Sequence, residues 1–277
     1  MIYIYLDDHT IKLLSLTKTM LGQYSVSHFS KNHTTSILHD GKVESIDLLA
    51  SAIKEALTLA QPHPITEKEV TLILPQQSFY FVRQEIPLGT DNASIIPILK
   101  DKLQQEHMAD LDSCTYTCLK QERSGEAVAT LFALNNIAAD SFKQACSLVG
   151  LQVKAITPEA VSYFKLFEKT LREEKKEIIW YIHYTETAAY GYLYDSLGLK
   201  DARRYEFVGD PQKFMKETAD EIAAQGSKIN RLILSGVDSS KVRQDHFTKT
   251  VGVWTNPLEK ILVNFYEQYT RILMPPE

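Results

Sequence analysis

The order of predicted strands and helices constrains the fold most, because the same order occurs twice along the chain. Strands are predicted where apolar residues alternate or run together between turn signals, and helices where they recur every three or four positions. The first set comprises strands 2–6, 11–17 and 22–30, a helix over 46–60 and a strand over 70–74. The second set comprises strands 178–183, 188–194 and 199–207, a helix over 211–224 and a strand over 231–234. A duplicated β-β-β-α-β unit predicts an α/β protein with two similar lobes.

The residues between the two units follow a different order, β-α-β-β-α-β. This block comprises a strand over 82–86, a helix over 93–106, strands 113–121 and 127–134, a helix that ends at Gly150 and a strand over 151–156. It has the size of a small inserted α+β subdomain with its own sheet. We therefore predict a first lobe over 1–75, an insert over 76–156 and a second lobe over 157–277, with a further helix from Pro257.

Composition and charge exclude several classes of protein. The chain has 277 residues and a net charge of -5, with no dense basic cluster, so we expect no nucleic-acid partner. Three cysteines cannot all pair, which favours a reducing compartment. The N-terminus lacks the basic start of a signal peptide, and the weakly charged stretch 178–194 contains His183 and Glu186, which argues against a membrane span. We expect a cytoplasmic protein that reaches the membrane through a partner.

No catalytic or metal-binding motif is present in the sequence. It contains no H-E-x-x-H, G-x-S-x-G or Walker loop. Cys114 and Cys118 are four positions apart on a predicted strand, which separates them by roughly 13 Å. One Zn²⁺ cannot bind both thiolates, since its bonds to sulfur are about 2.3 Å long. We therefore expect no metal site and no enzymatic activity.

Several segments, taken in order, resemble the actin-like ATPase superfamily. Within it the chain is similar to the bacterial type IV pilus assembly protein M family, relatives of the division protein FtsA. The matching pieces are Leu6-Asp7, Ile11–Leu14, His39–Val43, Ala52–Ala56, Val82–Leu88, Gly150–Val153, Ile156–Ala160, Leu232–Gly236 and Asn256–Ile261. This resemblance implies an actin-like, ribonuclease H-like fold of two lobes, with the middle block as the family's inserted subdomain.

The resemblance also implies a site for Mg-ATP, made by two hairpin loops and a glycine-rich turn. In the first loop Asp7, Thr10 and Lys12 match, but Asp8-His9 stands where a glycine lets backbone amides approach phosphate. In the adenosine turn Ser235 and Gly236 match, but the second glycine is replaced by valine. We therefore predict a vestigial nucleotide site, no bound cofactor and a pseudo-ATPase, with ATP and Mg²⁺ as the alternative.

The second hairpin loop departs further from the family. His183 occupies the position of the acid and Thr185 that of the glycine. His183 has two interpretations: a catalytic base, or a hydrogen-bonded core residue on an apolar strand. The second interpretation is favoured.

For function, the resemblance implies a cytoplasmic scaffold of a type IV pilus assembly platform. Its partner would be the N-terminal tail of an inner-membrane pilus assembly protein, held in a groove beside the insert, and self-association stays open. The alternatives are an ATP-binding switch or a division-type membrane-associated protein. A membrane tether needs a basic amphipathic helix at its end, whereas residues 262–277 contain Arg271 as their one basic residue. A type II secretion relative would carry a membrane span after this domain.

The aromatic stretch at the start of the insert is the candidate groove wall. The stretch Phe79–Phe81, in which Tyr80 and Phe81 are the predicted partner-binding residues, either lines a cleft that takes an extended peptide or belongs to a buried strand. An exposed sheet edge on the insert would supply backbone hydrogen bonds to such a peptide. Replacing both residues with alanine would separate these interpretations, because a groove role predicts weaker partner capture at an unchanged melting temperature.

Overall fold

The computed structural model describes residues 2–18, 24–107, 111–123, 125–165, 177–184, 188–206 and 229–236. The chain divides into two compact units, Met1–Ser162 and Tyr163–Glu277. Each unit is described by itself.

A five-stranded sheet forms the centre of the first unit. Its strands lie in the order β3-β2-β1-β4-β8. β1 (Ile2–Leu6), β2 (Thr10–Lys18) and β3 (Tyr24–Asn32) are antiparallel, whereas β4 (Glu69–Leu74) and β8 (Gln152–Pro158) run parallel to β1. Alternate residues of β1 and β4 are fully buried, as expected of central strands in a sheet with a packed face.

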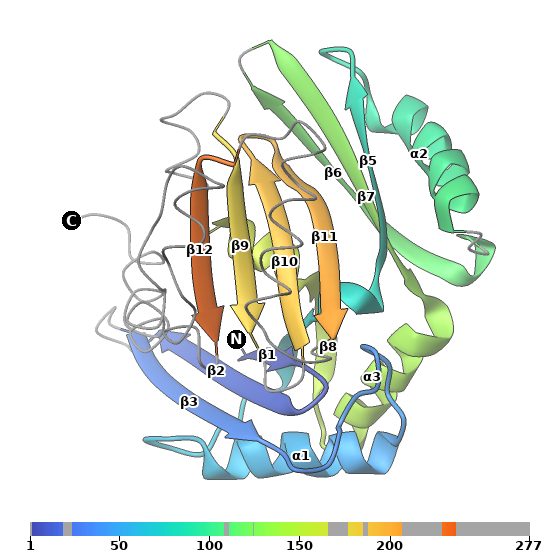
Figure 1. Cartoon of the computed structure of the whole chain (residues 1–277). Coiled ribbons are helices and arrows are strands. Elements are labelled where there is room, and N and C mark those ends of the chain that lie inside the picture. The colour runs from blue at the N-terminus through green and yellow to red at the C-terminus, as the bar shows by residue number, and fades with distance from the viewer. Residues whose placement is uncertain are drawn as a thin grey trace. The chain divides into compact units, whose positions relative to one another are not determined.

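Two helices pack together against this sheet. α1 (Ile46–Leu59) begins at Ser45, whose hydroxyl accepts a hydrogen bond from the Leu48 N–H. α3 (Asn136–Leu148) begins after Asn135, whose side-chain oxygen accepts from the N–H groups of the first turn. Both helices contribute to one hydrophobic core with the sheet, and they lie side by side in Figure 1.

A separate three-stranded sheet projects between β4 and α3. Its order is β5-β7-β6, and all neighbours are antiparallel. The strands are β5 (Tyr80–Ile86), β6 (Cys114–Arg123) and β7 (Glu126–Asn135). A short 3₁₀ turn precedes each of the first two: η1 (Gln76–Ser78) comes before β5 and η2 (Leu111–Ser113) before β6. α2 (Asn92–His107) covers one face and buries its apolar side chains there (Figure 1). The insert thus has a core of its own.

The predicted limit of the insert was wrong at its C-terminal side. The strand predicted over 151–156 is β8, which pairs with β4 in the sheet of the first unit, and α3 packs on α1. The physical reason is that a short strand sequence does not specify its partner, and parallel pairing joins residues far apart in the chain. The insert's own sheet therefore ends with β7.

The second unit repeats the strand order of the first. β11 (Gly198–Glu206), β10 (Ala188–Asp195), β9 (Ile179–Tyr184) and β12 (Arg231–Gly236) follow one another in the sheet, with β12 parallel to β9. This is the arrangement of β3, β2, β1 and β4, so the predicted duplication of the strands is observed. The helices predicted over 211–224 and from Pro257 lie outside the described residues.

A close contact at Gly41 joins three parts of the first unit. The Gly41 N–H donates to the Asp8 carboxylate at 3.2 Å, and the Ser78 hydroxyl donates to the Gly41 carbonyl at 2.6 Å. Gly41 has φ +69°, and a Cβ there would lie 2.9 Å from the Ser78 backbone nitrogen. Only glycine satisfies both the backbone conformation and the available space.

We predict that Gly41→Ala lowers the free energy of unfolding by roughly 2–4 kcal/mol, since a left-handed alanine costs about 1 kcal/mol and overpacking adds 1–3. Gly89→Ala is the matched control, because Gly89 has φ +77° with open space around it, and it should lose only about 1 kcal/mol. Urea unfolding of both variants measures the difference. Equal losses would show that the contact with Ser78 adds nothing.

Candidate functional site

Buried ionisable groups gather where β1 turns into β2. Asp7 is 4% exposed, and burial raises its pKa from 3.8 to about 6; the Asp8 charge adds to this, while the Asp8 N–H and Lys12 oppose it. Burial lowers the pKa of Lys12, against the attraction of Asp7 and Glu159. Glu159, 1% exposed, begins the helix after β8 and accepts a hydrogen bond from the Gln76 N–H at 3.2 Å. Burial therefore pushes Asp7 and Lys12 toward their neutral forms more strongly than mutual attraction keeps them charged.

The backbone of this hairpin is engaged by its own neighbours. The Asp7 N–H donates to the Thr10 carbonyl at 2.9 Å, and the Asp8 N–H donates to the Asp7 carboxylate at 2.5 Å. The Asp8 carbonyl accepts hydrogen bonds from the backbone N–H groups of Ile37 and Leu38. The Thr10 hydroxyl donates to the Asn32 side chain at 3.1 Å. Asp8, an unexpected acid in the sequence, thus fixes the loop that follows β3.

In the second unit, the predicted residues at the ends of β9 and β12 form a buried hydrogen-bonded chain. The hydroxyls of Tyr181 and Ser235 are 2.6 Å apart, and His183 Nδ1 lies 2.8 Å from Ser235 Oγ. Tyr163 packs against Tyr181, with ring centroids 4.7 Å apart. His183 is therefore a hydrogen-bonded core residue, the favoured one of its two interpretations. Gly236 ends β12 opposite Tyr184, whereas Thr185 and the valine after Gly236 lie outside the described residues.

Several polar groups at these two places are already hydrogen-bonded within the protein. A phosphate cradle needs backbone N–H groups directed at the ligand, and those of Asp7 and Asp8 are used within the hairpin. The Ser235 hydroxyl is fully buried and hydrogen-bonded to its own sheet. Among the described residues, no cluster of three or more carboxylate, histidine or cysteine side chains could hold a metal ion.

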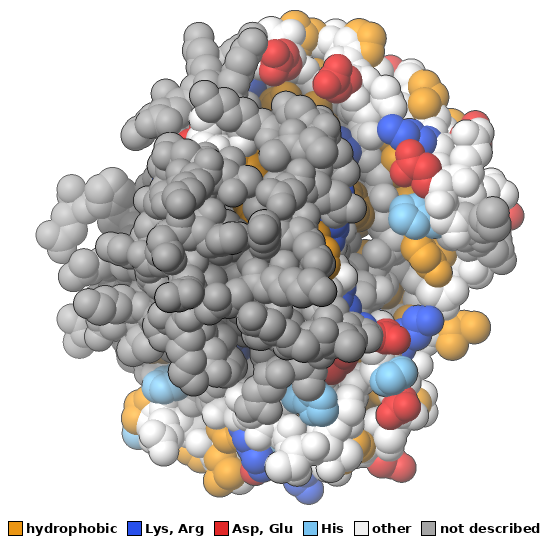
Figure 2. All heavy atoms as spheres, viewed as in Figure 1, with side chains coloured by type: hydrophobic (Ala, Val, Ile, Leu, Met, Phe, Trp, Pro, Cys, Tyr) orange, Lys and Arg blue, Asp and Glu red, His pale blue; other side chains and the backbone are white. Residues whose placement is uncertain are grey.

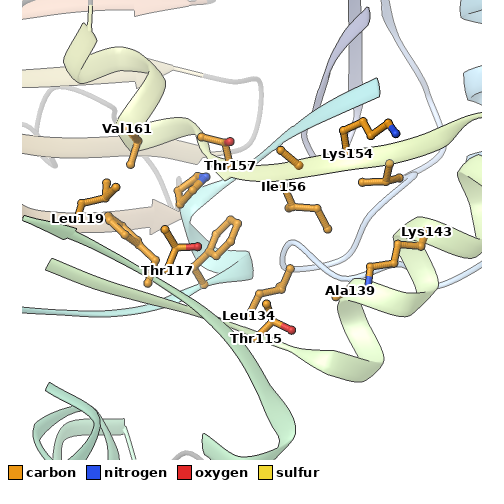
Figure 3. Close-up of a pocket in the computed structure, with 15 residues that line it drawn as sticks. Thr115, Thr117, Leu119, Leu134, Ala139, Lys143, Lys154, Ile156, Thr157 and Val161 are labelled. Carbon is orange, nitrogen blue, oxygen red and sulfur yellow. The ribbon is translucent and has the colours of Figure 1, made fainter. Parts of the chain in front are cut away.

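A cavity of about 540 Å³ lies between the inserted sheet and β8. One side is formed by β6 and β7, the other by β8, and α3 contributes to one end (Figure 3). The lining is mainly apolar or hydroxylated and comprises Phe79, Thr115, Thr117, Leu119, Phe132, Leu134, Ala139, Lys143, Val153, Lys154, Ala155, Ile156, Thr157, Pro158 and Val161. Clefts of this size and character are typical of ligand sites.

The alternation of β6 explains which side chains reach the cavity. Thr115, Thr117 and Leu119 line it, whereas the intervening side chains face α2. Lys100 of α2 lies over the Tyr116 ring, 3.8 Å from its centroid, and Cys118 packs against the core under α2. Successive residues of a strand point to opposite faces, so β6 gives one face to the insert's core and the other to the cavity.

The predicted groove residues Tyr80 and Phe81 lie on β5, at the other edge of the inserted sheet. Neither lines the cavity. Tyr80 is exposed, with its ring 5.5 Å from that of His107. Phe81 stacks on Phe132, with ring centroids 6.1 Å apart, and Phe132 does line the cavity. Their role in partner binding stays a prediction, and Phe81 would act through Phe132.

Sequence reasoning missed Glu159 and the cavity residues other than Phe79, which belongs to the predicted aromatic stretch. The threonines at 115 and 117 carried a usable signal, because hydroxyl side chains alternate there with larger ones on a predicted strand. Val153 and Ile156 carried none, since their sequence did not show that β8 pairs with β4. Glu159 carried no usable signal, since its contact with Gln76 depends on where two separate strands end.

Comparison with known proteins identifies the fold. No protein-family model matches the chain, and no curated protein does. Among solved structures, the PilM-PilN type IV pilus biogenesis complex matches with a TM-score of 0.70 at 14% identity, over 98% of this chain and 94% of the other. A Bacteroides thetaiotaomicron protein with actin-like ATPase fold and unknown function matches with a TM-score of 0.54 at 11% identity, over 91% and 88%. The chain has the actin-like ATPase fold.

A third structure shares this fold. The cytoplasmic domain of EpsL, an inner-membrane component of the type II secretion system of Vibrio cholerae, matches with a TM-score of 0.54 at 10% identity, over 100% of this chain and 96% of that domain. The predicted fold class is therefore confirmed. In the ranges that the structure describes, no helix is long and apolar enough to cross a bilayer.

We predict that Asp7→Asn stabilises the protein at pH 8 and has little effect at pH 4. The folded-state pKa of about 6 lies above the ordinary 3.8, so the stability that Asp7 contributes is present below pH 3.8 and is lost as the pH rises through 6. Removing the buried charge should recover about 3 kcal/mol above pH 7, because each unit of pKa shift corresponds to about 1.4 kcal/mol. Urea unfolding at pH 4, 6 and 8 measures this, with the exposed Asp101→Asn as control. A loss of stability at pH 8 would contradict it.

Proposed function

We propose that this chain is a cytoplasmic scaffold of a type IV pilus assembly platform. In this proposal it binds the N-terminal cytoplasmic tail of an inner-membrane pilus assembly protein and does not hydrolyse ATP. The likeness in fold to the PilM-PilN complex and to the EpsL cytoplasmic domain supports the kind of assembly. The protein would lie at the inner membrane through this partner.

The observation that carries the proposal is the cavity between β6 and β8. It has the volume of a ligand site and an apolar floor, including Phe132, Leu134 and Ile156. The cavity lies beside the inserted sheet, where the resemblance implies a groove for the tail. On the face that Figure 2 shows, basic and acidic side chains are interspersed among the described residues.

Three features support the absence of ATP hydrolysis. The backbone N–H groups of Asp7 and Asp8 are hydrogen-bonded within the first hairpin, and Asp7 is buried with a raised pKa. The Ser235 hydroxyl is hydrogen-bonded to Tyr181 and His183. Opening such contacts to admit a charged nucleotide would leave buried polar groups without partners. The ATP-binding switch is the alternative, and Lys12 beside Asp7 and Glu159 is the feature that favours it.

We predict that millimolar Mg-ATP leaves the melting temperature within 1 °C. A ligand at 100 times its dissociation constant would stabilise the folded state by about 2.7 kcal/mol, which is roughly 5 °C or more for a chain of this size. Thermal unfolding with and without Mg-ATP tests this. A clear rise that Asp7→Ala or a change at Gly236 abolishes would favour the ATP-binding switch.

We also predict that Thr117→Arg prevents capture of the partner, because it places a long charged side chain in the cavity. Ile98→Arg, on the exposed face of α2, adds the same charge elsewhere and should bind as the wild type does. Tagged protein is used to capture proteins from solubilised inner membranes, and the captured protein is identified by mass spectrometry. Its synthetic tail is then titrated by calorimetry. Equal binding by both variants would place the partner outside the cavity.

A further inference from the structure

The two edges of the inserted sheet differ in how they are protected. On β5, side chains occupy three alternate backbone carbonyls: His107 lies 3.2 Å from the Phe81 carbonyl, Lys102 donates to that of Arg83 at 2.9 Å, and Gln84 donates to that of Glu85 at 3.2 Å. These carbonyls point away from β7. An edge occupied in this way cannot accept another strand without losing those bonds.

The outer strands of the five-stranded sheet are also protected. The pairing of β8 with β4 shifts by one residue, which leaves Lys154 as an extra, unpaired position beside its ion pair with Glu69. A bulge with a lysine is a common protection of an edge. On β3, His28 and Gln61 exchange two backbone hydrogen bonds of 2.8 Å. Both edges are therefore partly covered or distorted.

The edge of β6 is open by contrast. Neighbouring residues of an antiparallel strand alternate between facing their partner and facing outward. The register runs without a shift from β5 through β7 to β6. Because the carbonyls of Phe81, Arg83 and Glu85 point away from β7, the same alternation carried across the sheet makes the backbone groups of Tyr116 and Cys118 point away from β7 on the β6 side. Among the described residues, no side chain or backbone group bonds to these outward groups. Residues 114–119 carry no charge, and Thr115, Tyr116 and Thr117 are exposed.

We propose that β6 binds the partner's tail as an added β-strand along residues 114–119. The inference rests on the proposed function and specifies how the tail is held. The outward N–H and C=O groups of Tyr116 and Cys118 bond to the tail, and alternate side chains of the tail enter the cavity toward Phe132, Leu134 and Ile156. About six residues in extended form span this edge.

The lining of the cavity defines the chemistry of the segment that fits. Apolar side chains at every second position suit the floor, and proline is excluded where the tail's N–H must donate. The charged residues that line the cavity, Lys143 and Lys154, are both basic, and each is paired on the exposed side with Asp140 or Glu69. The occupant is therefore an extended segment with alternating apolar side chains and no lysine or arginine directed into the cavity.

The test removes one outward N–H without removing the strand. Tyr116→Pro removes both the tyrosine ring and the outward backbone N–H of residue 116. Tyr116→Val also removes the ring but keeps this N–H. We expect Tyr116→Pro to weaken binding at least tenfold relative to Tyr116→Val, for the captured tail and for peptides selected from a library of random dodecapeptides displayed on phage. Glu85→Pro makes the corresponding change on the protected β5 edge and should leave the affinity within twofold of wild type. Equal affinities of the two Tyr116 variants would overturn strand addition.

A second measurement covers the case in which Tyr116→Pro does not fold. In the wild-type protein, saturating selected peptide should slow amide hydrogen exchange at Tyr116 and Cys118 at least tenfold, with no change at Glu85. Unchanged exchange at Tyr116 and Cys118 would overturn the proposal.

Two other outcomes separate the proposal from the proposed function. If wild-type protein captures no inner-membrane protein, the platform function fails, while the selected peptides still test the edge. If the library yields no alternating apolar peptide, and the protein instead forms dimers that Tyr116→Pro abolishes, the occupant is a second copy of the chain and the tail assignment is overturned.

Discussion

The parallel pairing of β8 with β4 determines the layout of the first unit. This pairing returns the chain to the five-stranded sheet after an insertion of about two helices and three strands, and it brings α3 against α1. β8 thereby becomes the outer strand beside the inserted sheet, and the space between them is the cavity. The buried end of the same strand leads directly to Glu159, near Gln76 and Lys12. One set of backbone hydrogen bonds thus positions both the candidate groove and the buried charged cluster.

The charged cluster and the cavity have opposite physical characters. At the β1–β2 hairpin, the backbone N–H groups of Asp7 and Asp8 both donate hydrogen bonds within the hairpin. Burial disfavours the charged form of the Asp7 carboxyl group and raises its pKa. Around β6 the backbone groups face outward without a partner among the described residues. Unsatisfied groups at a surface are available for binding, whereas groups already bonded in a core are not. This contrast supports the proposal that the partner is recognised at the insert.

The sequence was sufficient for the order of strands in both units, because alternation and turn signals are local. It was insufficient for the partner of β8, since Val153 and Ile156 read equally well as part of either sheet. The same limit applies to the groove. Phe79 lines the cavity, whereas its neighbours Tyr80 and Phe81 do not. Gln76 and Glu159 were missed because their proximity depends on two separate strand ends.

Photocrosslinking from within the cavity in living cells tests the central claim most directly. A p-benzoylphenylalanine at Leu119 lies on the cavity face of β6, and one at Ile98 lies on the exposed face of α2. The account predicts that illumination links position 119, and not position 98, to the N-terminal cytoplasmic segment of one inner-membrane assembly protein. Crosslinks to such a protein from position 98 with none from position 119 would contradict the account.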